Sequence, residues 1–176
     1  MKNPELVKFG SFGTRFGNCR LAMSRKGICF LGFFDTPAGD RETKTRLERI
    51  CRAVRLEENN ALIEPFADLI FSRPAGERLP EGVALDLTGT PFQLEVWRTL
   101  RTIPPGQTRS YREVAAAAGR PAAIRAAANA VAANPVAWLV PCHRVIRADG
   151  SLGGYRWNPA RKEAMLAWER EFSAGN

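Results

Sequence analysis

Cys142 stands directly before His143, the only histidine among the 176 residues. A free thiol titrates near pH ~8.5, so little of it is thiolate at neutral pH, and a nearby imidazole or positive charge raises that fraction. Successive side chains of an extended segment point to opposite faces. We therefore expect a relay from Cys142 to His143 through one water molecule, and not the direct contact of a cysteine protease.

The histidine needs a carboxylate on its other ring nitrogen, which fixes the tautomer and stabilises the protonated ring. Three glutamates near the C-terminus could supply it: Glu163, Glu169 and Glu171. The same pair of residues has a structural interpretation, because a buried cysteine is usually inert packing and a lone histidine is usually structural.

Other site chemistries find no support in the sequence. One histidine excludes sites that need two or three imidazoles, and the four scattered cysteines form no CxxC pair. Neither GxGxxG nor GxxxxGK[ST] occurs, so we expect no dinucleotide and no P-loop nucleotide. We predict that the protein holds no metal and no cofactor.

The longest apolar run, residues 27–34, is far shorter than the ~20 residues of a membrane-spanning helix. Residues 1–20 contain no basic segment followed by an apolar one, so no secretory signal is indicated. We expect a cytoplasmic protein with reduced thiols and no membrane partner.

The formal net charge of the whole chain is +8, and most of it lies in the second half. Residues 1–90 hold 14 basic and 12 acidic residues, whereas residues 91–176 hold 12 and 6, and 11 of those 12 are arginine. An arginine-rich half is typical of nucleic-acid binding, since the guanidinium fork fits phosphates and base edges. A solvated surface that keeps the protein soluble explains the charge equally well.

Two short helices in this half form a helix-turn-helix pattern. Ser110 can cap a helix over 111–118, residues 119–121 break it, and a second helix runs over 122–133 until Asn134-Pro135. The second helix is mostly alanine with one arginine, so it can pack tightly in a core or lie in a DNA groove. Nearby arginines favour the groove: Arg109, Arg112, Arg120 and Arg125.

The first half of the chain reads as strands followed by helices. Residues 18–23 and 28–34 are predicted as strands joined by a turn, and residues 40–57 as an amphipathic helix. A helix over 64–71 would carry Pro65 in its first turn. The region ends with a predicted linker over 72–83 and a short strand over 84–87.

The elements around the cysteine are more sharply marked. Thr90-Pro91 predicts a capped helix that ends before residues 104–106. Residues 136–140 are apolar and are predicted as a buried extended segment leading to Cys142. Asn158-Pro159 caps a final helix.

The segment Pro141-Cys142-His143-Arg144-Val145-Ile146 resembles the alkyl-acceptor motif of the O6-alkylguanine–DNA alkyltransferases. Further matches occur in the order and spacing of that family: Phe92-Gln93, Val96-Trp97, Ile103-Pro104, Gly106, Ser110-Tyr111, Arg125-Ala126, Asn134-Pro135, residues 154–157 (Gly-Tyr-Arg-Trp), Lys162 and Glu169. The specific part covers residues 90–170. Residues 1–88 match only loosely.

The resemblance implies an α/β (α+β) fold in two parts. Residues 1–88 would form a variable ribonuclease-H-like α/β subdomain. Residues 89–176 would form the helical, DNA-binding alkyltransferase subdomain with its helix-turn-helix.

The resemblance also implies a single-turnover DNA repair enzyme, a protein-cysteine S-methyltransferase. Cys142 would irreversibly accept an alkyl group from O6-alkylguanine, and O4-alkylthymine would be a lesser substrate. His143 would deprotonate Cys142 through a water, and Glu169 would hold His143. Asn134 would brace the turn before the cysteine, and Tyr111 would donate a hydrogen to the departing guanine.

The implied partner is double-stranded DNA, bound in its minor groove by a monomer with the damaged nucleotide rotated out. Arg125 would fill the gap that this nucleotide leaves. The implied DNA contacts are Arg125, Ala126, Ala127, Ala130, Ser110 and Arg144. The implied base pocket is lined by Tyr155 and by the backbone of Val145 and Arg156. The metal-bound regulatory domain and the histidine-bound zinc of some members are not expected here.

Two other functions remain open from the residues. A non-catalytic DNA-binding protein would use the basic helices and treat Cys142 as packing, and a cysteine hydrolase would turn over a small ester or amide. Three tryptophans could stack on bases, but we expect them in the core: Trp138, Trp157 and Trp168.

Overall fold

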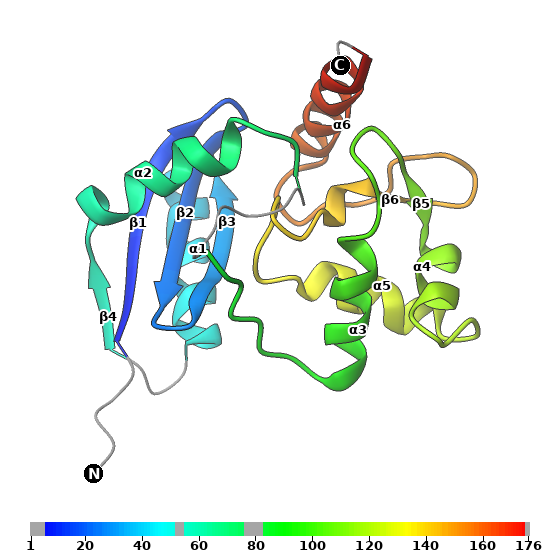
Figure 1. Ribbon diagram of the computed structural model, residues 1–176, viewed down its shortest axis with the longest axis horizontal. Coiled ribbons are helices and arrows are strands. Elements are labelled where there is room, and N and C mark those ends of the chain that lie inside the picture. Colours follow the sequence, from blue (N-terminus) through cyan, green and yellow to red (C-terminus); the bar gives the residue numbers. More distant parts are fainter. Residues whose placement is uncertain (1–5, 52–54, 76–82, 175–176) are drawn as a thin grey trace. The chain divides into compact units, whose positions relative to one another are not determined.

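The computed structural model in Figure 1 describes residues 6–51, 55–75 and 83–174. The chain separates into two compact units. The first contains the residues up to Arg73, residues 83–88 and Pro135–Ala137; the second contains the other described residues. Strands and helices both contribute, so the predicted mixed α/β class is confirmed.

The first unit is built on a four-stranded sheet in the order β3-β2-β1-β4. Its strands are β1 (Leu6–Thr14), β2 (Gly17–Ser24), β3 (Gly27–Phe34) and β4 (Arg55–Glu58). The first three form antiparallel hairpins, and β4 pairs parallel to β1. The two predicted strands and their turn are confirmed, whereas β1 was missed because glycines and polar residues interrupt its apolar alternation.

Two helices pack on this sheet, α1 (Pro37–Ile50) against β3 and α2 (Asn60–Phe71) against β1. Gly10 permits the close approach of α2, since a Cβ there would lie 2.9 Å from the Cβ of Ile63. Phe71, the last residue of α2, packs in the core, where its ring contacts those of Phe12, Phe16 and Phe33.

Several predicted boundaries in this unit were wrong. The helix predicted over 40–57 ends at Ile50, and Arg55–Glu58 is a strand because its backbone pairs with β1, which outweighs the helix propensity of its glutamates. Asn59 caps α2, so Pro65 lies inside the helix. The strand predicted over 84–87 is reduced to one bridge between Ile28 and Leu85. Most of the predicted linker, residues 76–82, lies outside the described residues.

The second unit is mainly helical. Its helices are α3 (Pro91–Leu100), α4 (Tyr111–Ala117), α5 (Ile124–Ala133) and α6 (Pro159–Ala174). The predicted caps at Thr90 and Ser110 are confirmed, each as a capping box with the residue three positions later. The indole nitrogen of Trp97 donates to the Ala130 carbonyl at 2.8 Å and ties α3 to α5.

The segment that leads to the cysteine is buried as predicted, but it is not extended. Val136 forms a parallel bridge to Leu31 of β3, and Trp138 turns the chain with a φ of 69°. Cys142–Arg144 then forms a 3₁₀ turn, η1, before the short strand β6 (Val145–Ile146), which pairs with β5 (Arg109–Ser110). Neighbouring side chains on a 3₁₀ turn diverge by a third of a turn, so the extended geometry expected at Cys142-His143 was wrong.

Within the described ranges, every helix is too short or too polar to cross a lipid bilayer.

Candidate active site

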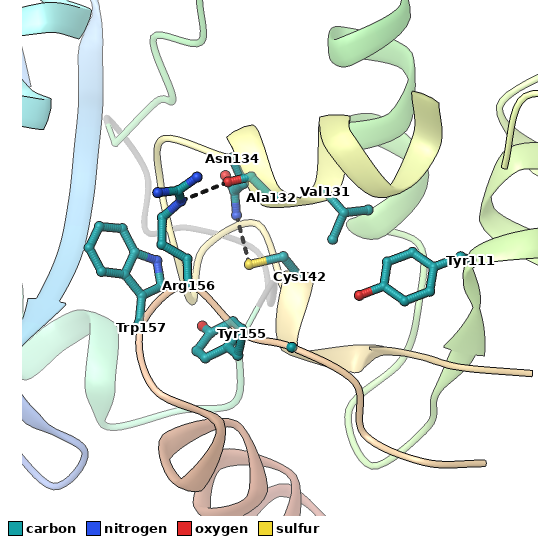
Figure 2. A pocket seen from close by; sticks show the side chains of 9 residues that line it. Tyr111, Val131, Ala132, Asn134, Cys142, Tyr155, Arg156 and Trp157 are labelled. Carbon is teal, nitrogen blue, oxygen red and sulfur yellow. Dashed lines mark hydrogen bonds between the residues drawn. The ribbon is translucent and has the colours of Figure 1, made fainter. Parts of the chain in front are cut away.

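A pocket of about 390 Å³ opens in the second unit, above the sulfur of Cys142 (Figure 2). It lies between the end of α5 and the segment that precedes α6. Its lining residues are Tyr111, Val131, Ala132, Asn134, Cys142, Gly154, Tyr155, Arg156 and Trp157. The pocket thus gathers residues from four separate parts of the chain around one thiol.

Asn134, the residue that ends α5, is bonded directly to this thiol. Its Nδ2 donates to the Val140 carbonyl at 2.8 Å. It also donates to the Sγ of Cys142 at 3.2 Å, the bond drawn in Figure 2. Burial raises the pKa of Cys142, while hydrogen bonds from Asn134 and Tyr155 and the positive charge of Lys162 oppose that rise. The site therefore favours a thiol that stays protonated until a base removes its proton.

His143 follows on the same 3₁₀ turn and is completely buried. Its Nε2 lies 3.0 Å from Oε1 of Glu169, on α6. Arg144 grips the same carboxylate from Nε at 2.9 Å and from Nη2 at 2.6 Å. Arg144 also donates to the carbonyls of Ile103 and Ala75, so the turn is fixed to α6 and to two loops.

The charges of this cluster define the tautomer of the histidine. Burial raises the pKa of Glu169, but hydrogen bonds and charge from His143 and Arg144 outweigh it and lower the pKa to about 2. Burial lowers the pKa of His143, so the ring is neutral at pH 7. An ionised carboxylate only accepts hydrogen bonds, so Nε2 carries the ring proton and Nδ1 carries the lone pair. Nδ1 is buried and has no hydrogen-bond partner among the described residues.

Lys162, on α6, holds the segment that follows the 3₁₀ turn. Its Nζ is fully buried and donates to the carbonyls of Val145, at 2.6 Å, and Leu152. Burial lowers the pKa of this amine to about 8, although Cys142 opposes the shift. A buried cation beside a thiol favours the thiolate once it forms.

Comparison with known proteins decides the family. Residues 91–171 match the family model described as "6-O-methylguanine DNA methyltransferase, DNA binding domain". The inducible methylated-DNA–protein-cysteine methyltransferase of Bacillus subtilis is 39% identical over 157 residues, which are 89% of this chain and 87% of that protein. The chain belongs to the methylated-DNA–protein-cysteine methyltransferase family. The resemblance of the cysteine motif is thereby confirmed.

Other relatives extend the match over both units. The bifunctional transcriptional activator/DNA repair enzyme Ada of Escherichia coli is 38% identical over 94% of this chain. The chain spans about half the length of Ada and of the Salmonella typhimurium regulatory protein ada, at 46% of each. The crystal structure of Mycobacterium tuberculosis OGT in complex with DNA matches with a TM-score of 0.71 and 32% identity, covering 93% of both chains.

The structure brings together most of the residues that the methyltransferase motif singled out. Cys142, Asn134, Tyr111, Tyr155 and Arg156 line one pocket. Behind the thiol, Glu169 is the glutamate of the three that contacts His143, whereas Glu163 and Glu171 are exposed.

Four other expectations need correction. Val145 is buried and does not line the pocket; its carbonyl accepts from Lys162. Ala127 and Ala130 are at most 2% exposed because they face the core of the second unit. Arg144 is 1% exposed and its guanidinium is paired with Glu169. The side chains of Ala127, Ala130 and Arg144 therefore cannot reach DNA in this conformation.

Some residues of the site were missed by sequence reasoning. Val131, Ala132 and Gly154 line the pocket but carry no chemical signal of their own. Trp157 is buried, as expected, and lines the pocket as well. Arg144 was taken for a DNA contact on the strength of the resemblance. Its position next to a buried histidine that needs a carboxylate was the available signal for an ion pair.

Acid is expected to destabilise the protein through this cluster. The folded-state pKa values of His143 and Glu169 lie below their ordinary values of 6.5 and 4.5, so both groups contribute stability that is fully present above pH 6.5. It falls first as the unfolded histidine protonates. It falls again between pH 4.5 and about 2, where Glu169 accounts for about 3 kcal/mol. Urea unfolding from pH 7.5 to pH 2 measures this loss.

Glu169→Gln is the matched comparison for that measurement. Its free energy of unfolding should change less than that of the wild type below pH 4.5. Parallel curves for the two proteins in that range would contradict the assignment.

Proposed function

We propose that the protein repairs DNA by direct reversal of damage, moving an alkyl group irreversibly from the O6 oxygen of guanine to Cys142. O4-alkylthymine is proposed as a second substrate. The observation that carries this proposal is the single thiol that lines an open pocket, backed by the buried His143–Glu169 pair. The relatives named as methylated-DNA–protein-cysteine methyltransferases support it.

The proposed reaction needs only side chains of this protein and one water molecule. Nδ1 of His143 accepts the thiol proton through one water molecule, and Glu169 stabilises the imidazolium that results. The thiolate attacks the alkyl carbon, a C–S bond forms and the C–O bond breaks. Asn134 donates to the sulfur while it is charged. The thioether is stable, so each protein molecule reacts once.

Tyr111 is proposed as the hydrogen donor to the departing guanine. It lines the pocket and is half-buried, and burial raises the pKa of its phenol. A phenol that keeps its proton at neutral pH can donate a hydrogen bond to a base that gains negative charge. We propose that Tyr155 and Arg156 hold the base in the pocket.

For DNA binding we propose that α4 and α5 act as a helix-turn-helix that enters the minor groove of a duplex. Of the DNA contacts expected on α5, Arg125 and Ala126 are exposed, and Ser110 at the start of α4 is half-buried. Arg125 fills the space of the rotated nucleotide. A monomeric state, a ribonuclease-H-like first unit and a cytoplasmic location stay predictions.

Mass spectrometry tests the transfer. The protein is mixed with a duplex that carries O6-methylguanine, then digested, and the peptide that contains Cys142 is weighed. We expect a gain of one methyl group per protein molecule, and none from the same duplex with plain guanine. No gain in mass would overturn alkyl transfer and favour a non-catalytic DNA-binding protein. Steady turnover of a small ester would indicate a cysteine hydrolase.

Arg125→Ala is expected to weaken binding to the lesion-bearing duplex by about tenfold, or ~1.4 kcal/mol. The exposed guanidinium is lost from α5, so the slope of log affinity against log salt should also fall by about one. Fluorescence anisotropy at several salt concentrations measures both values. Arg170→Ala removes the same charge from an exposed position on α6 and serves as control. Equal losses in the two variants would contradict a role specific to Arg125.

A further inference from the structure

The buried imidazole of His143 has a second partner that the proposed reaction does not use. The indole ring of Trp138 stacks on it, with ring centroids 5.4 Å apart and planes inclined by 15°. Both side chains are completely buried. The pair is therefore a buried stack in which the indole covers one face of the proposed base.

The backbone at Trp138 is held in an unfavourable conformation to make this stack. Its φ of 69° lies in the left-handed region, which bulky residues seldom adopt. Such strain persists only where the surroundings impose it, and it gathers at functional sites. Here the indole also packs against Trp168, 5.7 Å away, which in turn contacts Phe172.

The stacked indole restricts rotation of the imidazole about the Cβ–Cγ bond of His143. Rotation about the Cβ–Cγ bond is broad for imidazoles, and a single hydrogen bond at Nε2 does not fix the plane of the ring. Parallel contact with the indole face does fix it. The stack and the bond to Glu169 together determine where the lone pair on Nδ1 points.

The same contact bears on the charge of the ring. The face of an indole attracts cations, so it favours the imidazolium over the neutral ring. Glu169 favours the imidazolium as well, whereas Arg144 and Lys162 oppose it. Burial also opposes protonation of the ring, so the indole of Trp138 is one of the few groups that help His143 to take up a proton.

We propose that Trp138 is a positioning residue of alkyl transfer, which holds the plane of the His143 ring and stabilises that ring when it takes the proton of Cys142. The inference rests on the proposed function, because it assigns His143 the role of base. The roles proposed above for the pocket residues and for Glu169 stay the same.

The single histidine of the chain makes the test direct, since NMR of protein labelled in histidine gives one set of imidazole signals. We compare the wild type with Trp138→Leu, Trp138→Phe and the control Trp168→Phe, which alters the far side of the aromatic contact. In Trp138→Leu we expect an Nδ1-protonated tautomer to appear, a lower imidazole pKa, and alkyl transfer about tenfold slower. The control should keep the wild-type values.

The outcomes separate the two proposals. A wild-type protein that transfers no alkyl group overturns the proposed function, whatever the NMR shows. Transfer in the wild type, with rate, tautomer and imidazole pKa in Trp138→Leu equal to the control, overturns the role of Trp138. If Trp138→Leu does not fold, Trp138→Phe decides. Its smaller ring should lower the imidazole pKa and slow transfer, and values equal to the control overturn the inference.

Discussion

Cys142→Ala is expected to abolish alkyl transfer completely while the protein remains folded. The variant loses the nucleophile, and no other group in the pocket can form a stable thioether. Its fold should survive, because Asn134 keeps its bond to the Val140 carbonyl when the sulfur is removed. We expect a change of about 1 kcal/mol in the free energy of unfolding. Mass analysis after incubation with the lesion-bearing duplex, together with urea unfolding, measures both.

Cys51→Ala is the matched control, because it removes a cysteine that is more exposed than Cys142 and belongs to the first unit. That variant should still take up one alkyl group. Methylation of the Cys142→Ala protein at another thiol would contradict the assignment. Binding of the lesion-bearing duplex by Cys142→Ala, measured by anisotropy, should persist, which separates recognition from transfer.

Glu169→Gln is expected to be the most destabilising conservative change in the second unit. The carboxylate accepts two bonds from Arg144, one from His143 and one from the backbone of Gly106. An amide has a single acceptor oxygen and no charge, so the buried guanidinium loses its counter-ion. Breaking a buried ion pair from one side costs about 3–5 kcal/mol. Urea unfolding at pH 7.5 measures the loss.

The same substitution should slow alkyl transfer by about a hundredfold or more, the usual contribution of a positioned base. An uncharged partner neither fixes the tautomer of His143 nor stabilises its protonated ring. Glu163→Gln, an exposed position on the same helix, is the control and should stay within about 0.5 kcal/mol of the wild type. A Glu169→Gln protein as stable and as fast as this control would refute the role of the cluster.

Prediction from the sequence succeeded where the signal was local. The caps at Thr90 and Ser110 were read from side chains that bond to backbone groups three residues away. It failed at β4, whose four residues become a strand only through pairing with β1, almost fifty residues earlier. Such pairing leaves little trace in the segment itself.

The candidate site divides along the same line. Cys142 and His143 were found from their adjacency, and the residues alone left three glutamates as partners for the histidine. Burial decided what the sequence could not: Arg144 carries a charge that suits DNA, yet tertiary contacts place it inside, on Glu169. Ala127 and Ala130 likewise belong to the core, since a helix of small residues has no polar stripe to mark its outer face.

The short segment Pro135–Ala137 bears on how the chain can be divided. It lies between Asn134 and Trp138 in sequence, but its backbone partners are in β3: Leu31 receives a bond from Ala137 and donates one to Pro135, each at 2.9 Å. A gene fragment that encodes residues 89–176 alone would carry this stretch without its partner strand. Removal of residues 1–88 therefore breaks the hydrogen bonds on either side of Val136, two residues before Trp138, and the boundary read from the sequence is not a clean place to cut.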